Sequence, residues 1–217
     1  MSDTTGRPLR KDAARNRVAI VDAARTAFSE RGLGAPLEPI AAAAGVGNAT
    51  LYRHFPERAA LWEAVLREPL QEVLDLVRAC TDLAARDPWD GFATFIRRTA
   101  DIEARREGYS ELMTTRFTGA PVLLTLRAEI QNGVETLFHT AQDAGSVRAD
   151  TALEDVAVLQ LSMARTIEAF GDVAPELHRR WVGLLLDGFR APEGVREPLA
   201  GPPLRPNQIW RAVMRRH

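Results

Sequence analysis

Residues 40 to 55 place small side chains next to polar, aromatic and basic ones, in the order IAAAAGVGNATLYRHF. The second half of this segment offers amide, hydroxyl, imidazole and guanidinium groups, which suit phosphate oxygens and base edges. Elsewhere the sequence contains no paired-carboxylate motif, no nucleophile elbow, no phosphate-binding P-loop and no metal-ligand spacing. These residue types therefore favour recognition of an anionic partner over catalysis.

Two short helices that cross at a steep angle would position these groups. Ala41 is small where the helices must approach, and Gly45 can adopt the positive φ of a tight turn. Asn48 can cap the second helix. The side chains expected to face inward are Phe28, Ile40, Val46 and Leu51.

The opposite face of the second helix would then point outward. Its members are Gly47, Asn48, Ala49, Thr50, Tyr52 and Arg53. A helix with such a face fits the DNA major groove, which is about 12 Å wide. The segment thus predicts a helix-turn-helix, and the alternative is a plain helical hairpin.

The rest of the chain predicts an all-α fold, because apolar residues recur at helical spacing and no alternation with period two is sustained. Val18, Val21, Ala24 and Phe28 form the apolar stripe of a first helix. The expected helices cover residues 12–31, 37–44, 48–55, 57–81, 88–107, 110–117, 121–144, 151–170 and 175–190. The expected domains are a flexible basic arm (1–11), a helix-turn-helix domain (12–56), a ligand-binding and dimerisation domain (57–190) and a proline-rich tail (191–217).

The charge distribution points the same way. The 217 residues carry a net charge of −1, but residues 1–58 hold nine cations and six anions. The net charge is therefore +3 for residues 1–58 and −4 for the remaining residues. A basic N-terminal segment suggests an anionic partner for that segment, although a solvated tail would give the same net charge. The single cysteine, Cys80, predicts no disulfide, and no signal peptide or membrane span is apparent, which favours the cytoplasm.

Residues 51 to 61 read LYRHFPERAAL and resemble the L-Y-x-H-F-x-x-K-x-x-L pattern of the TetR family of bacterial repressors. The detailed resemblance covers residues 18–66, and beyond them only helix number, length and order agree. It implies a three-helix DNA-binding domain followed by a helical domain that dimerises and binds a small molecule. It also implies that Thr50, Tyr52 and His54 contact phosphates, that Asn48, Ala49 and Arg53 lie nearest the bases, and that Arg58, where the family has lysine, touches the DNA backbone.

The N-terminal arm supplies further candidates for DNA binding in Arg7, Arg10 and Lys11. A flexible basic arm can enter a narrow minor groove. The other interpretation is an untethered terminus that adds nonspecific charge. Either would steepen the salt dependence of binding.

The body carries two further sets of candidates. The aromatic and apolar side chains that could line a ligand pocket, or could be plain core, are Trp62, Leu66, Phe92, Phe95, Met113, Phe117, Leu124 and Phe138. The side chains expected at a dimer interface, unless both last helices simply pack on the body, are Val156, Met163, Ile167, Phe170, Trp181, Leu184 and Leu185.

The sequence therefore predicts a ligand-responsive transcriptional regulator, a repressor that binds a palindromic operator in double-stranded DNA as a homodimer. We expect no catalytic residue, metal or cofactor, and no membrane partner, but an unidentified small-molecule effector. The alternatives are a helical protein-interaction module without sequence-specific DNA binding and an all-helical enzyme.

Overall fold

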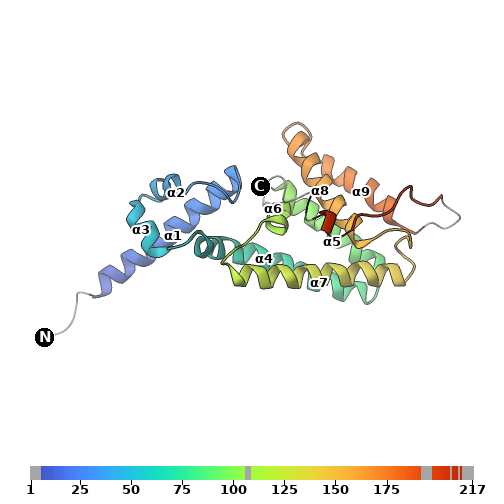
Figure 1. The fold of residues 1–217 in the computed structure, drawn as a ribbon, viewed down its shortest axis with the longest axis horizontal. Coiled ribbons are helices and arrows are strands. Elements are labelled where there is room, and N and C mark those ends of the chain that lie inside the picture. The colour runs from blue at the N-terminus through green and yellow to red at the C-terminus, as the bar shows by residue number, and fades with distance from the viewer. Residues whose placement is uncertain (1–5, 106–108, 192–196, 206, 210, 212–217) are drawn as a thin grey trace. The chain divides into compact units, whose positions relative to one another are not determined.

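The computed structural model describes residues 6–105, 109–191, 197–205, 207–209 and 211, with residues 6–11, 109 and 110 described by their backbone alone. The regular elements in these ranges are all α-helices (Figure 1). The helices are α1 (Gly6–Arg31), α2 (Leu37–Ala43), α3 (Asn48–His54), α4 (Arg58–Ala84), α5 (Pro88–Ala104), α6 (Tyr109–Thr114), α7 (Pro121–Asp143), α8 (Leu153–Phe170) and α9 (Leu177–Phe189). The predicted all-α fold is confirmed.

The chain divides into two compact units. The first comprises residues 1–70 and 115–125, and the second comprises residues 71–114 and 126–217. The division falls within α4 and α7, whose first turns lie in the first unit, and the predicted domain boundary after residue 56 stays a prediction. Both α4 and α7 therefore continue from one unit into the other.

In the first unit, α1, α2 and α3 form a small three-helix core. The buried side chains are Ile20, Ala24, Phe28, Leu37, Ile40, Ala41, Leu51 and Phe55. Val18, which was predicted to join this stripe, is instead 60% exposed. The apolar stripe of α1 is rotated from the predicted one. Ile20 faces the core in place of Val18, at helical spacing from Ala24 and Phe28.

The second unit buries its aromatic side chains around Phe92 of α5. The Phe92 ring lies 6.2 Å from Phe138 of α7 and 6.0 Å from Phe189 of α9, measured between centroids. Around this centre α5, α8 and α9 pack on one another. Asp87 caps α5 by accepting a hydrogen bond of 2.9 Å from the Asp90 N–H, and Pro88 occupies the first turn, where no N–H is needed.

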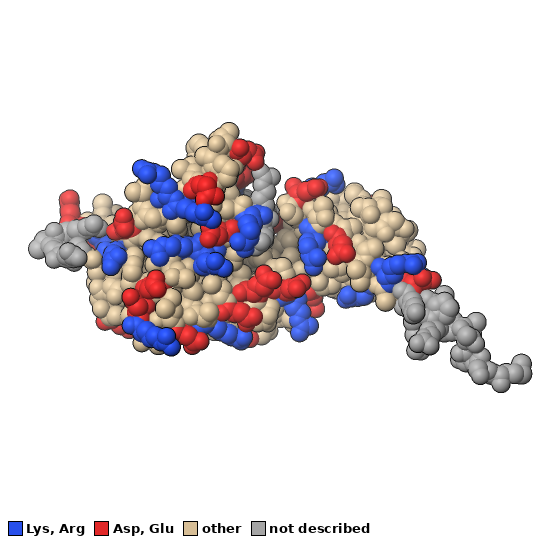
Figure 2. All heavy atoms as spheres, turned by 180° about the vertical axis from the view of Figure 1, so that it is seen from behind, with Lys and Arg blue, Asp and Glu red and all other residues tan. Residues whose placement is uncertain are grey.

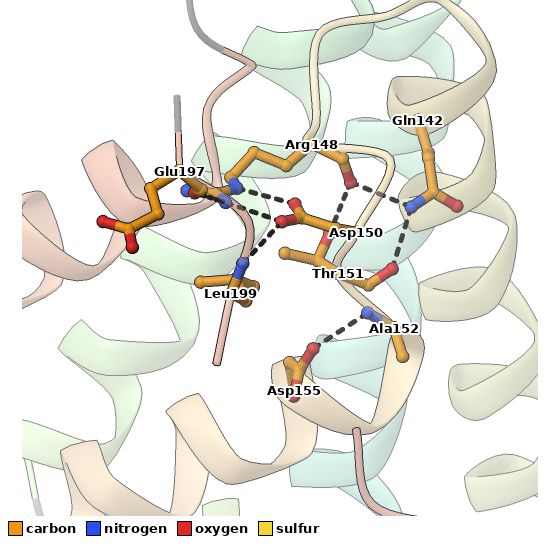
Figure 3. Close-up of polar contacts among 8 residues, drawn as sticks. All are labelled: Gln142, Arg148, Asp150, Thr151, Ala152, Asp155, Glu197 and Leu199. Carbon is orange, nitrogen blue, oxygen red and sulfur yellow. Dashed lines mark hydrogen bonds and ion pairs between the residues drawn. The ribbon is translucent and has the colours of Figure 1, made fainter. Parts of the chain in front are cut away.

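A polar cluster ties the chain after α9 to the α7–α8 loop (Figure 3). The guanidinium of Arg148, which is buried, donates two hydrogen bonds to Asp150, at 2.8 and 2.7 Å. Asp150 also accepts the Leu199 N–H at 2.9 Å, and Arg148 donates to the Glu197 carbonyl at 3.2 Å. Because these bonds favour the carboxylate, they hold the pKa of Asp150 well below its usual range. The described part of the predicted tail is thus attached to the second unit.

Replacing Asp150 by Asn should lower the thermal unfolding midpoint by a few degrees at neutral pH. A carboxyl group whose pKa is depressed by folding stabilises the fold above its unfolded pKa of about 3.9, and this contribution is lost as the pH falls. The difference between wild type and Asp150→Asn should therefore shrink between about pH 5 and pH 2, measured by calorimetry. Asp82→Asn, which alters an exposed carboxylate of α4, serves as the control. A difference that does not change with pH would contradict the assignment.

Candidate DNA-binding interface

The turn between α2 and α3 is built on Gly45, whose φ of 68° lies in the left-handed region. The Gly45 N–H donates to the Ala42 carbonyl and the Val46 N–H to the Ala41 carbonyl, each at 3.0 Å. These two bonds form a Schellman motif, which ends a helix and reverses the chain. A Cβ at position 45 would meet no atom within 4 Å, so the glycine is required by the backbone conformation and not by space. The predicted role of Gly45 is confirmed.

The inner side of α3 is anchored by two side chains. Leu51 is 0% and Phe55 1% exposed, so both are buried in the first unit, as are Ile40 and Ala41 of α2. Val46, predicted to be part of this core, is only half-buried. Leu51 and Phe55 lie one helical turn apart and so fix which face of α3 points outward.

The outer side of α3 carries the side chains that the sequence singled out. Asn48, Ala49 and Arg53 are exposed, Tyr52 is 46% exposed, and Thr50 is half-buried. Asn48 is not the cap that was predicted. The N-cap residue is Gly47, and no side-chain cap bond forms, because α3 begins at Asn48 itself.

His54, predicted to contact a phosphate, is less accessible than the exposed candidates on α3. Its side chain is half-buried, and its Nε2 is enclosed with no hydrogen-bond partner in the described part of the chain. An enclosed nitrogen cannot reach a phosphate without a movement of the side chain. His54 follows the buried Leu51 by three positions, which turns it toward the inner side of α3.

Arg58, predicted to contact the DNA backbone, has hydrogen-bond partners within the first unit. Its Nη1 donates to the carbonyls of Ala35 at 2.7 Å and Leu33 at 3.3 Å, and the side chain is half-buried. Trp62, one turn later on α4, donates its indole N–H to the same Leu33 carbonyl at 3.1 Å. The first turns of α4 therefore hold the α1–α2 loop in place.

The remaining basic candidates divide into described and undescribed residues. The side chains of Arg7, Arg10 and Lys11 lie outside the described residues, although the backbone from Gly6 is helical and extends α1 beyond its predicted start at Asp12. Sequence reasoning missed a specific position for Arg17, whose guanidinium carbon lies 5.0 Å from the centre of the Phe55 ring. This contact places a positive charge near the end of α3. The only signal for Arg17 in the sequence was the local density of basic residues.

Figure 2 shows basic and acidic side chains intermingled over the face that it draws, without a broad field of one sign among the described residues. On this face no broad basic patch is available to attract an anionic partner. Long-range attraction by the whole protein, with a net charge of −1, contributes little.

The predicted pocket residues are divided between the two units. Trp62, Leu66, Phe117 and Leu124 fall in the first unit, and Phe92, Phe95, Met113 and Phe138 fall in the second. Leu124 is 41% exposed, whereas Phe92, Phe95 and Phe138 are at most 1% exposed and fill the core. Trp62 packs edge-on against Phe117 with ring centres 5.8 Å apart.

A small recess lies instead between α5 and α8 in the second unit. Its lining residues are Ile96, Thr99, Ala100, Glu103, Leu159, Gln160 and Met163. None of them was among the predicted pocket residues, because they are mostly small or aliphatic and sequence reasoning had favoured aromatic side chains.

The predicted dimer residues also divide into two groups. Val156 and Met163 are 1% and 2% exposed in the single chain, so they belong to its core and cannot form an interface, contrary to the prediction. Ile167 and Leu185 are half-buried, and the side chains that remain on the surface are Phe170, Trp181 and Leu184. Val158 and Val173 are exposed as well, at 41% and 81%, and were missed. Exposed apolar side chains on α8, α9 and their connection suit a protein contact.

Within the described ranges no group of three or more His, Cys, Asp or Glu side chains could hold a metal ion. No helix there is both long and apolar enough to cross a membrane.

Two family models and a relative match this chain. Residues 20–65 match the family model described as bacterial regulatory proteins of the tetR family, and residues 87–191 match the SbtR-like transcriptional regulator C-terminal domain. The chain is 34% identical over 179 residues to the HTH-type transcriptional regulator RutR of Escherichia coli O157:H7, covering 80% of this chain and 82% of that protein.

Solved structures agree in fold. The ketosteroid transcriptional regulator KstR2 of Mycobacterium tuberculosis superposes with a TM-score of 0.59 at 17% identity, over 80% of this chain and 94% of that one. A tetR-family regulatory protein from Rhodococcus RHA1 superposes with a TM-score of 0.56 at 19% identity, over 82% of this chain and 98% of that one. At such identities these two matches bear on the fold alone.

Proposed function

Since the chain belongs to the TetR family of bacterial transcriptional regulators, we propose that it represses transcription from a palindromic operator, which it binds as a dimer until a small molecule releases it. Membership of the family makes it a helix-turn-helix DNA-binding regulator, as the sequence predicted. The operator, the dimer, the effector and action in the cytoplasm are the proposal.

The observation that carries the proposal is the division of α3 into two faces. Leu51 and Phe55 fix the helix to the first unit, and Asn48, Tyr52 and Arg53 remain exposed on the other side. In such an arrangement Arg53 is suited to guanine and Asn48 to adenine in the major groove. Tyr52 is suited to a phosphate oxygen, because its hydroxyl can donate.

The proposed dimer rests on the apolar face of the second unit. Phe170, Trp181 and Leu184 would lose their contact with water when two copies join α8 and α9. A two-fold dimer of helix-turn-helix proteins reads half-sites about 34 Å apart, one turn of DNA. The operator should accordingly be a palindrome.

The proposed release by an effector rests on the connections made by α4 and α7. Arg58 and Trp62 bind the α1–α2 loop, and Glu63 accepts the Val122 N–H at the start of α7 at 3.1 Å. Both helices continue into the second unit, so a ligand that displaces either one would disturb the loop that precedes α2 and α3. Coupling of this kind is usually about 1–3 kcal/mol, or five- to 150-fold in affinity.

Replacing Tyr52 by Ala tests the proposed interface. We expect operator affinity, measured by mobility shift on the DNA upstream of the protein's own gene, to fall about fivefold, because a phosphate contact is lost. The loss should be similar for every operator sequence, since a phosphate carries no sequence information. His139→Ala, a change at an exposed histidine of α7, should bind like wild type.

Unchanged affinity of Tyr52→Ala would favour the alternative, in which the helix-turn-helix meets another protein. The absence of any specific band with wild-type protein would remove the proposed function altogether.

A further inference from the structure

His178 lies in the first turn of α9 and is only 5% exposed. Both nitrogens of its ring have hydrogen-bond partners. Nδ1 lies 2.8 Å from the carbonyl oxygen of Pro175, in the α8–α9 connection, and Nε2 lies 3.0 Å from Oδ1 of Asp101 on α5. The imidazole therefore joins α9 and the connection before it to α5.

The identity of the two partners fixes the number of protons. A carbonyl oxygen only accepts, so Nδ1 must carry a hydrogen. An ionised carboxylate also only accepts, so Nε2 must carry one as well. A neutral imidazole has a single N–H, and it would leave one of these contacts without a hydrogen. A neutral histidine beside an ionised aspartate has one hydrogen for these two contacts. The observed geometry requires two, so the pair must hold one additional proton.

The surroundings place this proton on the histidine. Arg179 donates to the same Asp101 oxygen at 3.3 Å, and a carboxylate accepts two such donors better than a carboxylic acid does. Although burial acts to raise the pKa of Asp101, the hydrogen bonds from His178 and Arg179 outweigh it and keep that pKa below the ordinary value. This geometry suits an imidazolium against a carboxylate.

We propose that His178 and Asp101 form a proton-sensitive contact, which holds α9 on α5 while His178 is protonated and loosens when it loses its proton. The next turns of α9 carry Trp181 and Leu184, and the connection before it carries Val173. The contact consequently controls how the exposed apolar face is presented. This inference rests on the proposed function, in which that face forms the dimer.

The other charged groups near the pair do not supply the missing proton. From α5 the facing group is Asp101, and from the start of α9 it is Arg179, which also pairs with Glu176. On α8, which packs against both helices, Arg165 and Glu168 pair with each other. An arginine side chain is not deprotonated in proteins, so Arg179 is not the group that switches this contact.

The direction of the pH effect follows from the imidazolium. Both hydrogen bonds form together only in the protonated form, so their joint stabilisation is complete at low pH, and one of the two is lost as the pH rises. Asp101 acts in the opposite sense, since its carboxylate is needed and protonating it in strong acid breaks the contact. The dimer should therefore be tightest in mildly acidic solution.

Sedimentation equilibrium of the full chain between pH 5.5 and 8.5 tests the proposal. We expect the dimer dissociation constant to rise about fivefold or more over this range in wild type. His178→Gln and Asp101→Asn should bind less tightly at pH 5.5 and show little dependence on pH. His139→Gln, which alters an exposed histidine of α7, should keep the wild-type dependence.

Two outcomes are distinguishable. A dimer whose dissociation constant is the same at every pH, or whose pH dependence survives in His178→Gln, overturns the proton-sensitive contact and leaves the proposed function intact. A chain that is monomeric at every pH overturns the proposed dimer instead. In that case the imidazole ¹⁵N shifts of His178 still decide the contact, because two protonated nitrogens at pH 5.5 support it and a single protonated nitrogen contradicts it.

Discussion

Replacing Gly91 by Ala should lower the free energy of unfolding by about 2 kcal/mol, although alanine is the better helix former. Gly91 lies in the first turn of α5, where that helix crosses the end of α4. A Cβ at position 91 would lie 2.5 Å from the Ala84 Cβ, 2.7 Å from the Ala84 Cα and 2.7 Å from the Cys80 carbonyl oxygen. Two of these three atoms belong to the backbone, so the helices must move apart to admit a methyl group.

The matched control is Gly188→Ala near the end of α9, where an added Cβ would meet no atom within 4 Å. The same methyl group should there leave stability unchanged or raise it by up to about 1 kcal/mol, from helix propensity alone. Urea unfolding followed by circular dichroism measures both variants. A Gly91→Ala protein as stable as Gly188→Ala would show that α4 and α5 do not cross as closely as described.

Replacing Leu184 by Glu should convert the dimer to monomers and weaken operator binding by about 100-fold or more. Leu184 is 54% exposed in the single chain, so the monomer should fold normally. In a two-fold interface each substitution appears twice, and a carboxylate placed there without a partner carries a large desolvation penalty. Sedimentation and mobility shift at fixed salt measure the two effects.

Leu204→Glu introduces the same charge at a leucine that is 39% exposed in the segment after α9, and it should leave both measurements unchanged. If Leu184→Glu remained dimeric with full affinity, the α8–α9 face would not be the interface.

Local signals in the sequence predicted much of the fold. Gly45 and Pro88 mark helix ends through backbone conformations that neighbouring residues cannot change, and both ends lie within a residue of their predicted positions. The outer face of α3 was also predictable, because Leu51 and Phe55 are apolar at helical spacing and must turn inward.

The sequence did not reveal contacts between residues that are remote from one another along the chain. Arg58 bonds to carbonyls 25 and 23 residues earlier, and a charged side chain does not reveal whether it will meet a loop or a phosphate. Val156 and Met163 belong to an apolar stripe, but a stripe does not show whether the same chain or a second copy covers it. The Asp101–His178 contact joins residues 77 apart and leaves no periodic signal.

The central claim is that the exposed face of α3 reads the operator sequence. Selection of bound fragments from random DNA, by wild type and by Arg53→Ala, tests it most directly. Loss of one guanidinium that contacts a base should relax the preference at one symmetry-related pair of positions, cost about 1–3 kcal/mol there, and leave the other positions as in wild type. Arg86→Ala, a change at an exposed arginine of the second unit, should select the wild-type sequence. Identical preferences for wild type and Arg53→Ala at every position would contradict base reading by Arg53, and an absence of any preference in wild type would contradict the claim as a whole.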